Sequence, residues 1–227
     1  MSINRVDRID DLVPIRNIIV SVADKTGLEG FIPGLIALEP EIHIYSTGAT
    51  YERISEILGE EWAQNLTTIS DYTGHPEMQG GLVKTLDFRI YLGLLSETYN
   101  EAHVDDLLRT KAVVFDMVVC NLYPFGEASS QEGATPEDAR GNIDIGGPCL
   151  LRAAAKNYLR VAAVCDPLDY PDVLGSLRKN GGSLDLETRY QCAQKAFSHT
   201  GEYEKLISEY FHETRAETLR STYTIAE

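Results

Sequence analysis

Positive charge is scarce in this sequence of 227 residues, in which 20 Lys and Arg side chains stand against 35 Asp and Glu. The formal net charge of -15 predicts no nucleic-acid partner and no membrane-surface partner, because both attract basic proteins. Long apolar runs are also lacking, and none approaches the roughly 20 residues that span a bilayer. The stretch 1–11 mixes both charges without an apolar core, so it does not have the pattern of a signal peptide.

Paired cysteines are lacking as well. The sequence contains no CxxC pair and no cysteine–histidine spacing that is typical of zinc, so we expect no metal site. Several of the four cysteines lie in apolar stretches, which predicts buried free thiols. These absences together predict a cytoplasmic protein in a reducing compartment. The four residues are Cys120, Cys149, Cys165 and Cys192.

Short apolar stretches rich in β-branched residues alternate with longer stretches of helical periodicity. We predict strands at 16–22, 41–46, 112–123 and 160–167, and helices at 24–38, 48–59, 101–109 and 146–157. This alternation predicts βαβ units and a mostly parallel, doubly wound sheet of the α/β class. From Asp185 to Glu213 the pattern is helical, which predicts a C-terminal helical cover. The stretch 126–138 has the composition of a loop, and we expect fraying over 208–227.

The stretch 144–157, DIGGPCLLRAAAKN, predicts a packed helix that ends on a cation. Pro148 suits the first helical turn, where its missing N–H is not needed. Lys156 is explained either as a cation facing the negative end of the helix dipole or as part of an anion site. The residue types alone favour the dipole explanation and leave the anion site open.

Five polar motifs stand where ligands of a doubly wound sheet bind, beyond the carboxyl ends of strands. A Gly-Thr turn before a helix is usually only a cap, so each motif alone is a weak signal. The convergence of Lys25, the Thr47–Thr50 turn and Lys84–Thr85 at one sheet edge predicts a phosphate site. Taken singly, Tyr123 is equally explained by packing, and Asp144 by entry into a helix. The motifs are SVADKTG, YSTGAT, GGLVKTL, CNLYPF and DIGG.

Together, the motifs resemble the inosine monophosphate (IMP) cyclohydrolase domain of the bifunctional purine-biosynthesis family, in order from about Asn17 to Glu213. The motifs that carry the resemblance are SVADKTG, STGAT, SDYTGHPEMQGGLVKTL, CNLYPF, NIDIGGPCLLRAAAKN, KAFSHT and YFHE. The resemblance implies a methylglyoxal-synthase-like fold with a helical C-terminal cover. It divides the chain into an N-terminal extension (1–16), an α/β domain (17–213) and a C-terminal tail (214–227).

The implied reaction closes 5-formamidoimidazole-4-carboxamide ribotide to inosine monophosphate with loss of water. It requires no metal and no redox cofactor, and the resemblance implies a homodimer. The formyltransferase domain of the bifunctional family does not follow in this sequence. We therefore expect that activity to be absent and a separately encoded formyltransferase to be a partner.

The resemblance also assigns roles to residues. It implies catalytic roles for Lys84, Tyr123, Asp144 and Lys156, two cations, a phenol and a carboxylate that suit charge stabilisation and proton transfer. About 12 Å of helix separates Pro148 from Lys156, so we expect Asp144 and Lys156 to flank a pocket rather than to form a pair. The implied substrate-binding residues are Asp24, Lys25, Thr47, Gly48, Ala49, Thr50, Val83, Thr85, Cys120, Asn121, Ile145 and Gly146.

Several positions depart from the family pattern and predict a divergent member. Ala23 stands for a Ser, Leu82 for an Arg, Ala49 for the second Gly of the phosphate turn, and Asp87-Phe88 for His-Pro. Loss of the Arg predicts weakened binding of the anionic nucleotide, unless another cation, Arg89 or Arg152, has replaced it. Two alternatives stay open: a non-catalytic purine-nucleotide-binding regulator, and a methylglyoxal-synthase-type lyase, which lacks a matching Asp/His set here.

Overall fold

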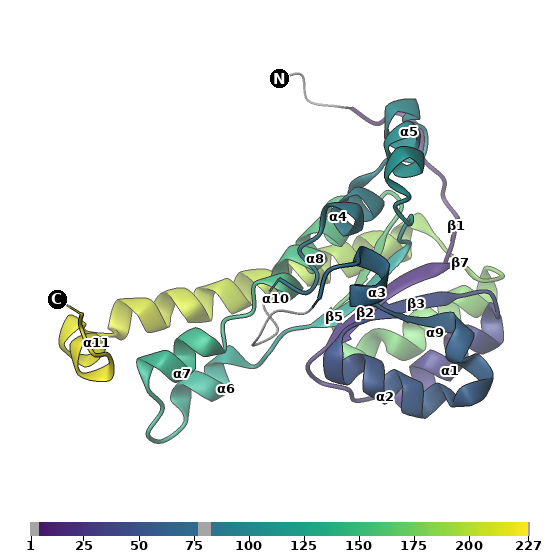
Figure 1. Ribbon diagram of the computed structural model, residues 1–227. Coiled ribbons are helices and arrows are strands. Elements are labelled where there is room, and N and C mark those ends of the chain that lie inside the picture. Colours follow the sequence, from purple (N-terminus) through teal and green to yellow (C-terminus); the bar gives the residue numbers. More distant parts are fainter. Residues whose placement is uncertain (1–4, 77–82, 227) are drawn as a thin grey trace.

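The computed structural model describes residues 5–76 and 83–226. At its centre lies a five-stranded sheet of order β4-β3-β2-β5-β6, in which all neighbouring strands are parallel (Figure 1). The strands are β2 (Asn17–Val22), β3 (His43–Ser46), β4 (Leu66–Thr68), β5 (Met117–Asn121) and β6 (Ala162–Val164). Because the chain winds from β2 toward β4 and then from β5 toward β6, the expected doubly wound α/β class is confirmed. Ligands bind such sheets at the carboxyl ends of the strands, beside the point of reversal.

Helices cover both faces of the sheet, because successive strand residues point to opposite faces. On β5, Met117 and Val119 join the core on one face, whereas Val118 and Cys120 join the core on the other. The first face packs against α1 (Leu28–Leu38), α2 (Gly48–Leu58) and α9 (Tyr170–Lys179). The second packs against α4 (Phe88–Leu95), α8 (Gly146–Lys156) and α10 (Leu186–Glu213).

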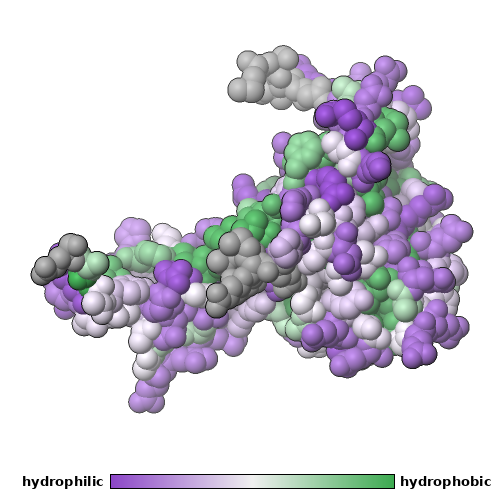
Figure 2. Space-filling view, viewed as in Figure 1, coloured by the Kyte–Doolittle hydropathy of each residue, from purple (hydrophilic) through white to green (hydrophobic). Residues whose placement is uncertain are grey.

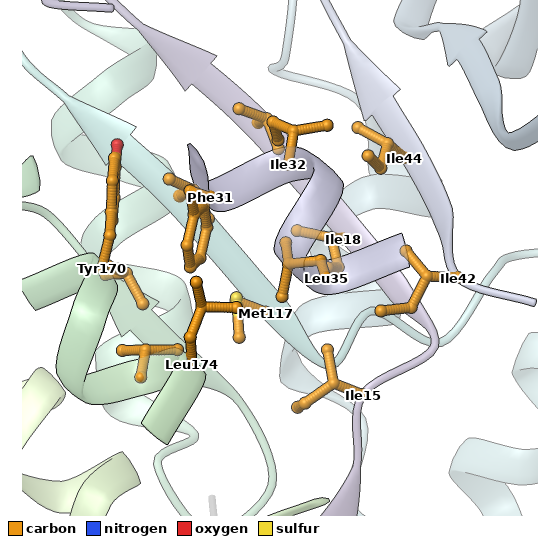
Figure 3. Close-up of a cluster of buried hydrophobic side chains, with 14 of the residues drawn as sticks. Ile15, Ile18, Phe31, Ile32, Leu35, Ile42, Ile44, Met117, Tyr170 and Leu174 are labelled. Atoms are coloured by element: carbon orange, nitrogen blue, oxygen red, sulfur yellow. The ribbon is translucent and has the colours of Figure 1, made fainter. Parts of the chain in front are cut away.

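The core of the first face contains large apolar side chains from both layers. Figure 3 shows Phe31 and Leu35 of α1 between the sheet residues Ile18 and Met117 and the side chain of Tyr170. The rings of Phe31 and Tyr170 stack with 4.2 Å between their centroids and 15° between their planes. This packing fixes α1 and α9 on the sheet, and with them the loops at the carboxyl ends of β2 and β6.

The remaining elements surround this sandwich. They are the strands β1 (Val13–Pro14) and β7 (Ser183–Leu184), the short helices η1 (Glu60–Asn65) and η3 (Pro167–Asp169), and the helices α3 (Ile69–Thr73), α5 (Glu101–Thr110), α6 (Phe125–Ser130), α7 (Pro136–Gly141) and α11 (Ala216–Thr222). The outer part of α10 extends away from the sheet as an arm, beside α6, α7 and α11 (Figure 1). Figure 2 shows a hydrophobic band over α8 and α10, bordered by hydrophilic surface.

The strand predicted over 112–123 is shorter than expected. Regular pairing begins at Met117, because the backbone before Asp116 bonds outside the ladder: Val113 N donates to the Tyr72 hydroxyl at 2.8 Å, and Phe115 N to the Gly93 carbonyl at 3.3 Å. The Asp116 carboxylate then accepts from the backbone N–H groups of Arg16 and Asn17 at 3.0 and 2.9 Å. Apolar composition therefore overestimated the length of the strand.

The prediction of a loop over 126–138 holds only for 131–135, since α6 ends at Ser130 and α7 begins at Pro136. A capping box starts α7: Thr135 accepts from Asp138 N at 3.2 Å, and the Asp138 carboxylate accepts from Thr135 N at 2.9 Å. Fraying was expected over 208–227, but much of this stretch is helical: α10 reaches Glu213, and α11 follows it. The Tyr223 hydroxyl after α11 donates to Glu137 at 2.7 Å.

The N-terminal stretch before β2 is bonded to the body of the molecule. The strand β1 pairs antiparallel with β7, and Ile15 is fully buried. The guanidinium of Arg189 is buried at the start of α10 and donates to five backbone carbonyls. These belong to Asp10, Asp11, Tyr158, Leu159 and Leu184. In the part of the chain that the structure describes, no helix combines the length and apolar character needed to cross a bilayer.

Candidate active site

A cavity of about 290 Å³ lies at the carboxyl ends of β2, β3 and β5, next to the N-terminus of α8. The β2 and β5 ends mark the point where the winding of the sheet reverses, the place expected for a ligand. Most of the residues predicted for the site line this cavity. They are Lys25, Thr47, Ala49, Thr50, Val83, Lys84, Thr85, Asn121, Tyr123, Asp144, Ile145 and Gly146.

One side of the cavity is suited to an anion. Thr47 is the N-cap of α2, and Gly48 begins the helix with a positive φ of 45°. A Cβ atom at Gly48 would lie 3.0 Å from the ammonium nitrogen of Lys84, so the lysine reaches directly over the first turn of α2. An ammonium group beside free helix N–H groups is a favourable environment for phosphate.

The backbone next to Lys84 is held in an unusual conformation. Val83 has a φ of 64°, a region that β-branched residues rarely adopt and that costs of order 1–3 kcal/mol. Gly146 allows this segment to approach α8, since a Cβ atom there would lie 2.9 Å from the Thr85 hydroxyl oxygen. Backbone strain of this kind concentrates at functional sites, and here it accompanies the placement of the Lys84 ammonium.

Two of the predicted threonines also have structural partners. The Thr50 hydroxyl donates to the Val22 carbonyl at 3.0 Å and accepts from Val22 N at 3.2 Å, which fastens α2 to the end of β2. The hydroxyl oxygens of Thr47 and Ser21 lie 3.4 Å apart. Thr50 therefore supports the turn through its side chain, and its backbone N–H donates to the Thr47 carbonyl at 3.1 Å.

Asp144 also lines the cavity, just before α8. Its Oδ1 accepts from Gly147 N at 2.9 Å, so the carboxylate caps the first turn of the helix. A Cβ atom at Gly147 would lie only 2.6 Å from Oδ2, which explains why glycine stands there. Burial raises the pKa of the Asp144 carboxyl, and hydrogen bonds from the backbone of Gly147, Tyr123 and Gly146 oppose the shift.

Tyr123 and Ile145 lie at the mouth of the cavity, where they are 57% and 58% exposed. The Tyr123 phenol comes from the segment that leaves β5, and the Tyr123 backbone opposes the rise in the pKa of the Asp144 carboxyl. A phenol, a carboxylate of raised pKa and an ammonium group thus line one cavity. Such a set can hold a phosphate, stabilise an oxyanion and transfer protons.

The structure does not bring every predicted residue to this cavity. Lys156 is exposed at the far end of α8, so the expectation that Asp144 and Lys156 flank one pocket is wrong. The catalytic role that the resemblance implies for Lys156 stays a prediction. Cys120 is buried beneath the cavity, with its sulfur 3.9 Å from the Gly147 carbonyl oxygen. Burial raises the pKa of the Cys120 thiol, so it remains protonated.

A second cavity of about 430 Å³ lies beyond Asn121, and Asp24 lines this one instead. Asn121 separates the two by bonding the loop after β2: its Oδ1 accepts from Asp24 N at 2.9 Å and its Nδ2 donates to the Asp24 carbonyl at 2.8 Å. From the KAFSHT motif, Lys195 lines this cavity and pairs with Asp166 at 2.7 Å. Within residues 5–76 and 83–226, no cluster of three or more His, Cys, Asp or Glu side chains could hold a metal ion.

The departures from the family pattern have different structural settings. Ala23 lines the first cavity, whereas Leu82 lies outside the described residues. Asp87 caps α4, accepting from Arg89 N at 2.8 Å, and Phe88 begins that helix largely exposed. The Asp-Phe pair therefore serves as a helix start beside the site.

Sequence reasoning missed Tyr203, whose hydroxyl accepts from Asp144 N at 2.7 Å. Tyr203 lies on α10, far from Asp144 in the sequence, and follows the KAFSHT motif closely. Nothing in the local pattern distinguishes it from a packed aromatic residue. Only the tertiary arrangement of α10 against the loop before α8 reveals the contact.

Comparison with known proteins identifies the family of this chain and several proteins that are similar to it. Residues 27–149 match the family described as MGS-like domain, and the chain belongs to that family. Residues 154–227 match the family described as AICARFT/IMPCHase bienzyme. The crystal structure of ForH superimposes with a TM-score of 0.72 at 31% identity, over 87% of this chain and 99% of that one.

Several sequence relatives carry the name "Bifunctional purine biosynthesis protein PurH". The protein from Rhodopirellula baltica is 44% identical over 200 residues, which cover 88% of this chain and 37% of that protein. The protein from Bacillus cereus strain G9842 is 43% identical over 207 residues, 91% of this chain and 39% of its own length. The chain thus spans less than half the length of these relatives, and the family resemblance seen in the motifs is confirmed.

Proposed function

We propose that this protein is an IMP cyclohydrolase of purine biosynthesis, which closes 5-formamidoimidazole-4-carboxamide ribotide to inosine monophosphate. The PurH relatives are named as bifunctional purine biosynthesis proteins, and residues 154–227 match a family whose description includes IMPCHase. The observation that carries the proposal is the convergence of Lys84, Tyr123 and Asp144 with the Thr47–Thr50 turn around one cavity.

The reaction is a condensation within one molecule. The carboxamide nitrogen attacks the formyl carbon, and the tetrahedral intermediate then loses the formyl oxygen as water. That water carries one hydrogen from the carboxamide nitrogen and one from the formamido nitrogen, so no oxidant or second substrate enters. Catalysis therefore requires orientation of the ribotide, a donor for the developing oxyanion and a group that accepts and returns a proton.

The cavity residues meet these requirements as follows. The ribotide phosphate binds at the first turn of α2, beneath the ammonium group of Lys84. This anchor directs the imidazole ring across the cavity toward Asp144. The raised pKa of the Asp144 carboxyl brings its proton affinity closer to that of the reacting groups, which suits it to proton transfer. Tyr123, at the mouth, supplies a hydroxyl donor to the intermediate.

The test is addition of the formamido ribotide to purified protein while purine-ring absorbance is followed. Chelator is present, and folate and added nucleotide are absent. We expect inosine monophosphate to form, and Asp144→Asn to lower kcat by about 100-fold or more, because a proton-transfer group is lost. Asp172→Asn, an exposed carboxylate in the first turn of α9, is the matched control and should keep wild-type kcat. Tight binding of inosine monophosphate without ring closure would instead support the non-catalytic regulator.

A further inference from the structure

Asp144 is held by two different helices, one of which belongs to the arm. Its side chain caps α8 through Gly147 N, and its backbone N–H donates to the Tyr203 hydroxyl of α10 at 2.7 Å. The same hydroxyl lies 3.4 Å from the Asn142 carbonyl oxygen, to which it donates. One phenol oxygen therefore bonds twice to the loop that carries Asp144.

The Tyr203 ring is itself fixed. The residue is only 6% exposed, and its ring packs edge-on against Phe125, with 6.3 Å between the centroids. Phe125 begins α6 and also contacts Tyr210 of α10, with 5.7 Å between the ring centroids. The hydroxyl of Tyr203 is thus presented to the loop by a packed aromatic cluster rather than by a mobile side chain.

We propose that Tyr203 is a positioning residue for ring closure, which fixes the Asp144 backbone so that the carboxylate faces the reacting atoms. This inference rests on the proposed function. Tyr203 does not line the cavity, so it acts through Asp144 and has no contact with the nucleotide. Reacting groups must be held within about 0.5 Å of their productive positions, and two anchors restrain the Asp144 loop more tightly than the α8 cap alone.

Tyr203→Phe removes the hydroxyl and retains the ring that packs on Phe125. We expect kcat to fall about 10-fold to 100-fold, the loss that accompanies a displacement of about 1 Å at a reacting group. KM and the affinity for inosine monophosphate should change less than twofold, because the phosphate anchor at α2 is untouched. Tyr210→Phe is the matched control, since Tyr210 lies on the same helix and packs on the same ring. It should leave both constants unchanged.

A measurement without substrate tests the same contact. Hydrogen exchange at the Asp144 amide, followed by NMR, should accelerate at least 10-fold in Tyr203→Phe and stay at the wild-type rate in Tyr210→Phe. If wild-type protein does not close the ring, the proposed function fails, while the exchange data still decide whether Tyr203 holds Asp144. The inference is overturned if Tyr203→Phe keeps the wild-type exchange rate. It is equally overturned if kcat is unchanged in Tyr203→Phe, or if Tyr210→Phe lowers kcat by the same factor.

Discussion

Gly147 offers a sharp test of how closely the site is packed. It is buried in the first turn of α8, and a Cβ atom there would lie 2.6 Å from Oδ2 of Asp144 and 2.6 Å from Cδ2 of Leu122. Leu122 is itself buried and lines the cavity beyond Asn121. The variant Gly147→Ala must therefore push the Asp144 carboxylate away from α8, although that carboxylate accepts the Gly147 N–H at 2.9 Å.

Three terms set the expected loss of stability. Overpacking costs about 1–3 kcal/mol, and weakening a hydrogen bond to a charged group costs about 1.5–3 kcal/mol. Alanine is the better helix former, which returns about 0.5–1 kcal/mol. We expect the free energy of unfolding to fall by about 1.5–5.5 kcal/mol on these terms. Ring closure should also slow by about 100-fold, because the carboxylate has moved by a substantial fraction of an ångström.

Gly175→Ala provides the matched control. Gly175 lies inside α9, and a Cβ atom there would meet no atom within 4 Å. The control should therefore gain about 0.5–1 kcal/mol, the opposite sign. Urea unfolding monitored by circular dichroism measures both changes, and purine absorbance measures turnover. The reasoning is refuted if Gly147→Ala is as stable and as active as wild type, or if both variants shift the unfolding midpoint in the same direction.

Four further predictions address charge. Lys84→Met should weaken binding of inosine monophosphate by about 10-fold to 100-fold, whereas Lys205→Met on the exposed face of α10 should not, as calorimetric titration will show. Arg189→Met, which leaves five backbone carbonyls without their buried donor, should lower the free energy of unfolding by more than about 3 kcal/mol in urea. Asp144→Asn should be more stable than wild type at neutral pH. Burial raises the pKa of the wild-type Asp144 carboxyl, so the stability of the wild type falls as pH rises from the unfolded-state pKa through the folded-state pKa. The difference in stability between variant and wild type should therefore vanish below about pH 4. A variant that is less stable than wild type at neutral pH would contradict this prediction. Lys156→Ala should leave the affinity for inosine monophosphate unchanged, because Lys156 does not line the cavity, and its effect on kcat decides whether the implied catalytic role holds.

The alternation of strands and helices was readable from the sequence because each buried strand is bounded by polar turns. The core strands β2, β3, β5 and β6 lie within the predicted stretches. The error over 112–116 arose because apolar residues there are half-buried or buried, but by contacts with Tyr72 and α4 rather than by a neighbouring strand. Apolar composition reports burial, and it does not report which backbone groups pair.

The missed helix α7 shows a different kind of error. Its start carries a local signal, since Thr135 and Asp138 stand at the spacing of a capping box with Pro136 in the first turn. The Gly, Ser and Glu residues before it gave the whole stretch the composition of a loop. Here the spacing of the capping box would have corrected the prediction made from composition.

The site itself was predictable to the extent that parallel strands end at one edge of the sheet. That rule brought Lys25, the Thr47–Thr50 turn and Lys84 together, and the resemblance added Asn121 and the catalytic role of Asp144. Neither source could predict Tyr203, because its contact with Asp144 depends on where α10 crosses the loop before α8. A contact of that kind has no periodicity and no local motif.

Residues that are neighbours in the sequence can line different cavities, so a motif alone does not define a site. Asp24 and Lys25 follow the same strand, yet Asp24 lines the cavity beyond Asn121 and Lys25 lines the cavity that contains Asp144. Likewise Asp144 and Lys156 belong to one motif, but α8 places them at opposite ends of a helix roughly 16 Å long, since each residue advances 1.5 Å. A shared motif therefore indicates that residues belong to one helix or strand. They line the same cavity only if they lie at the end of that element that borders the cavity.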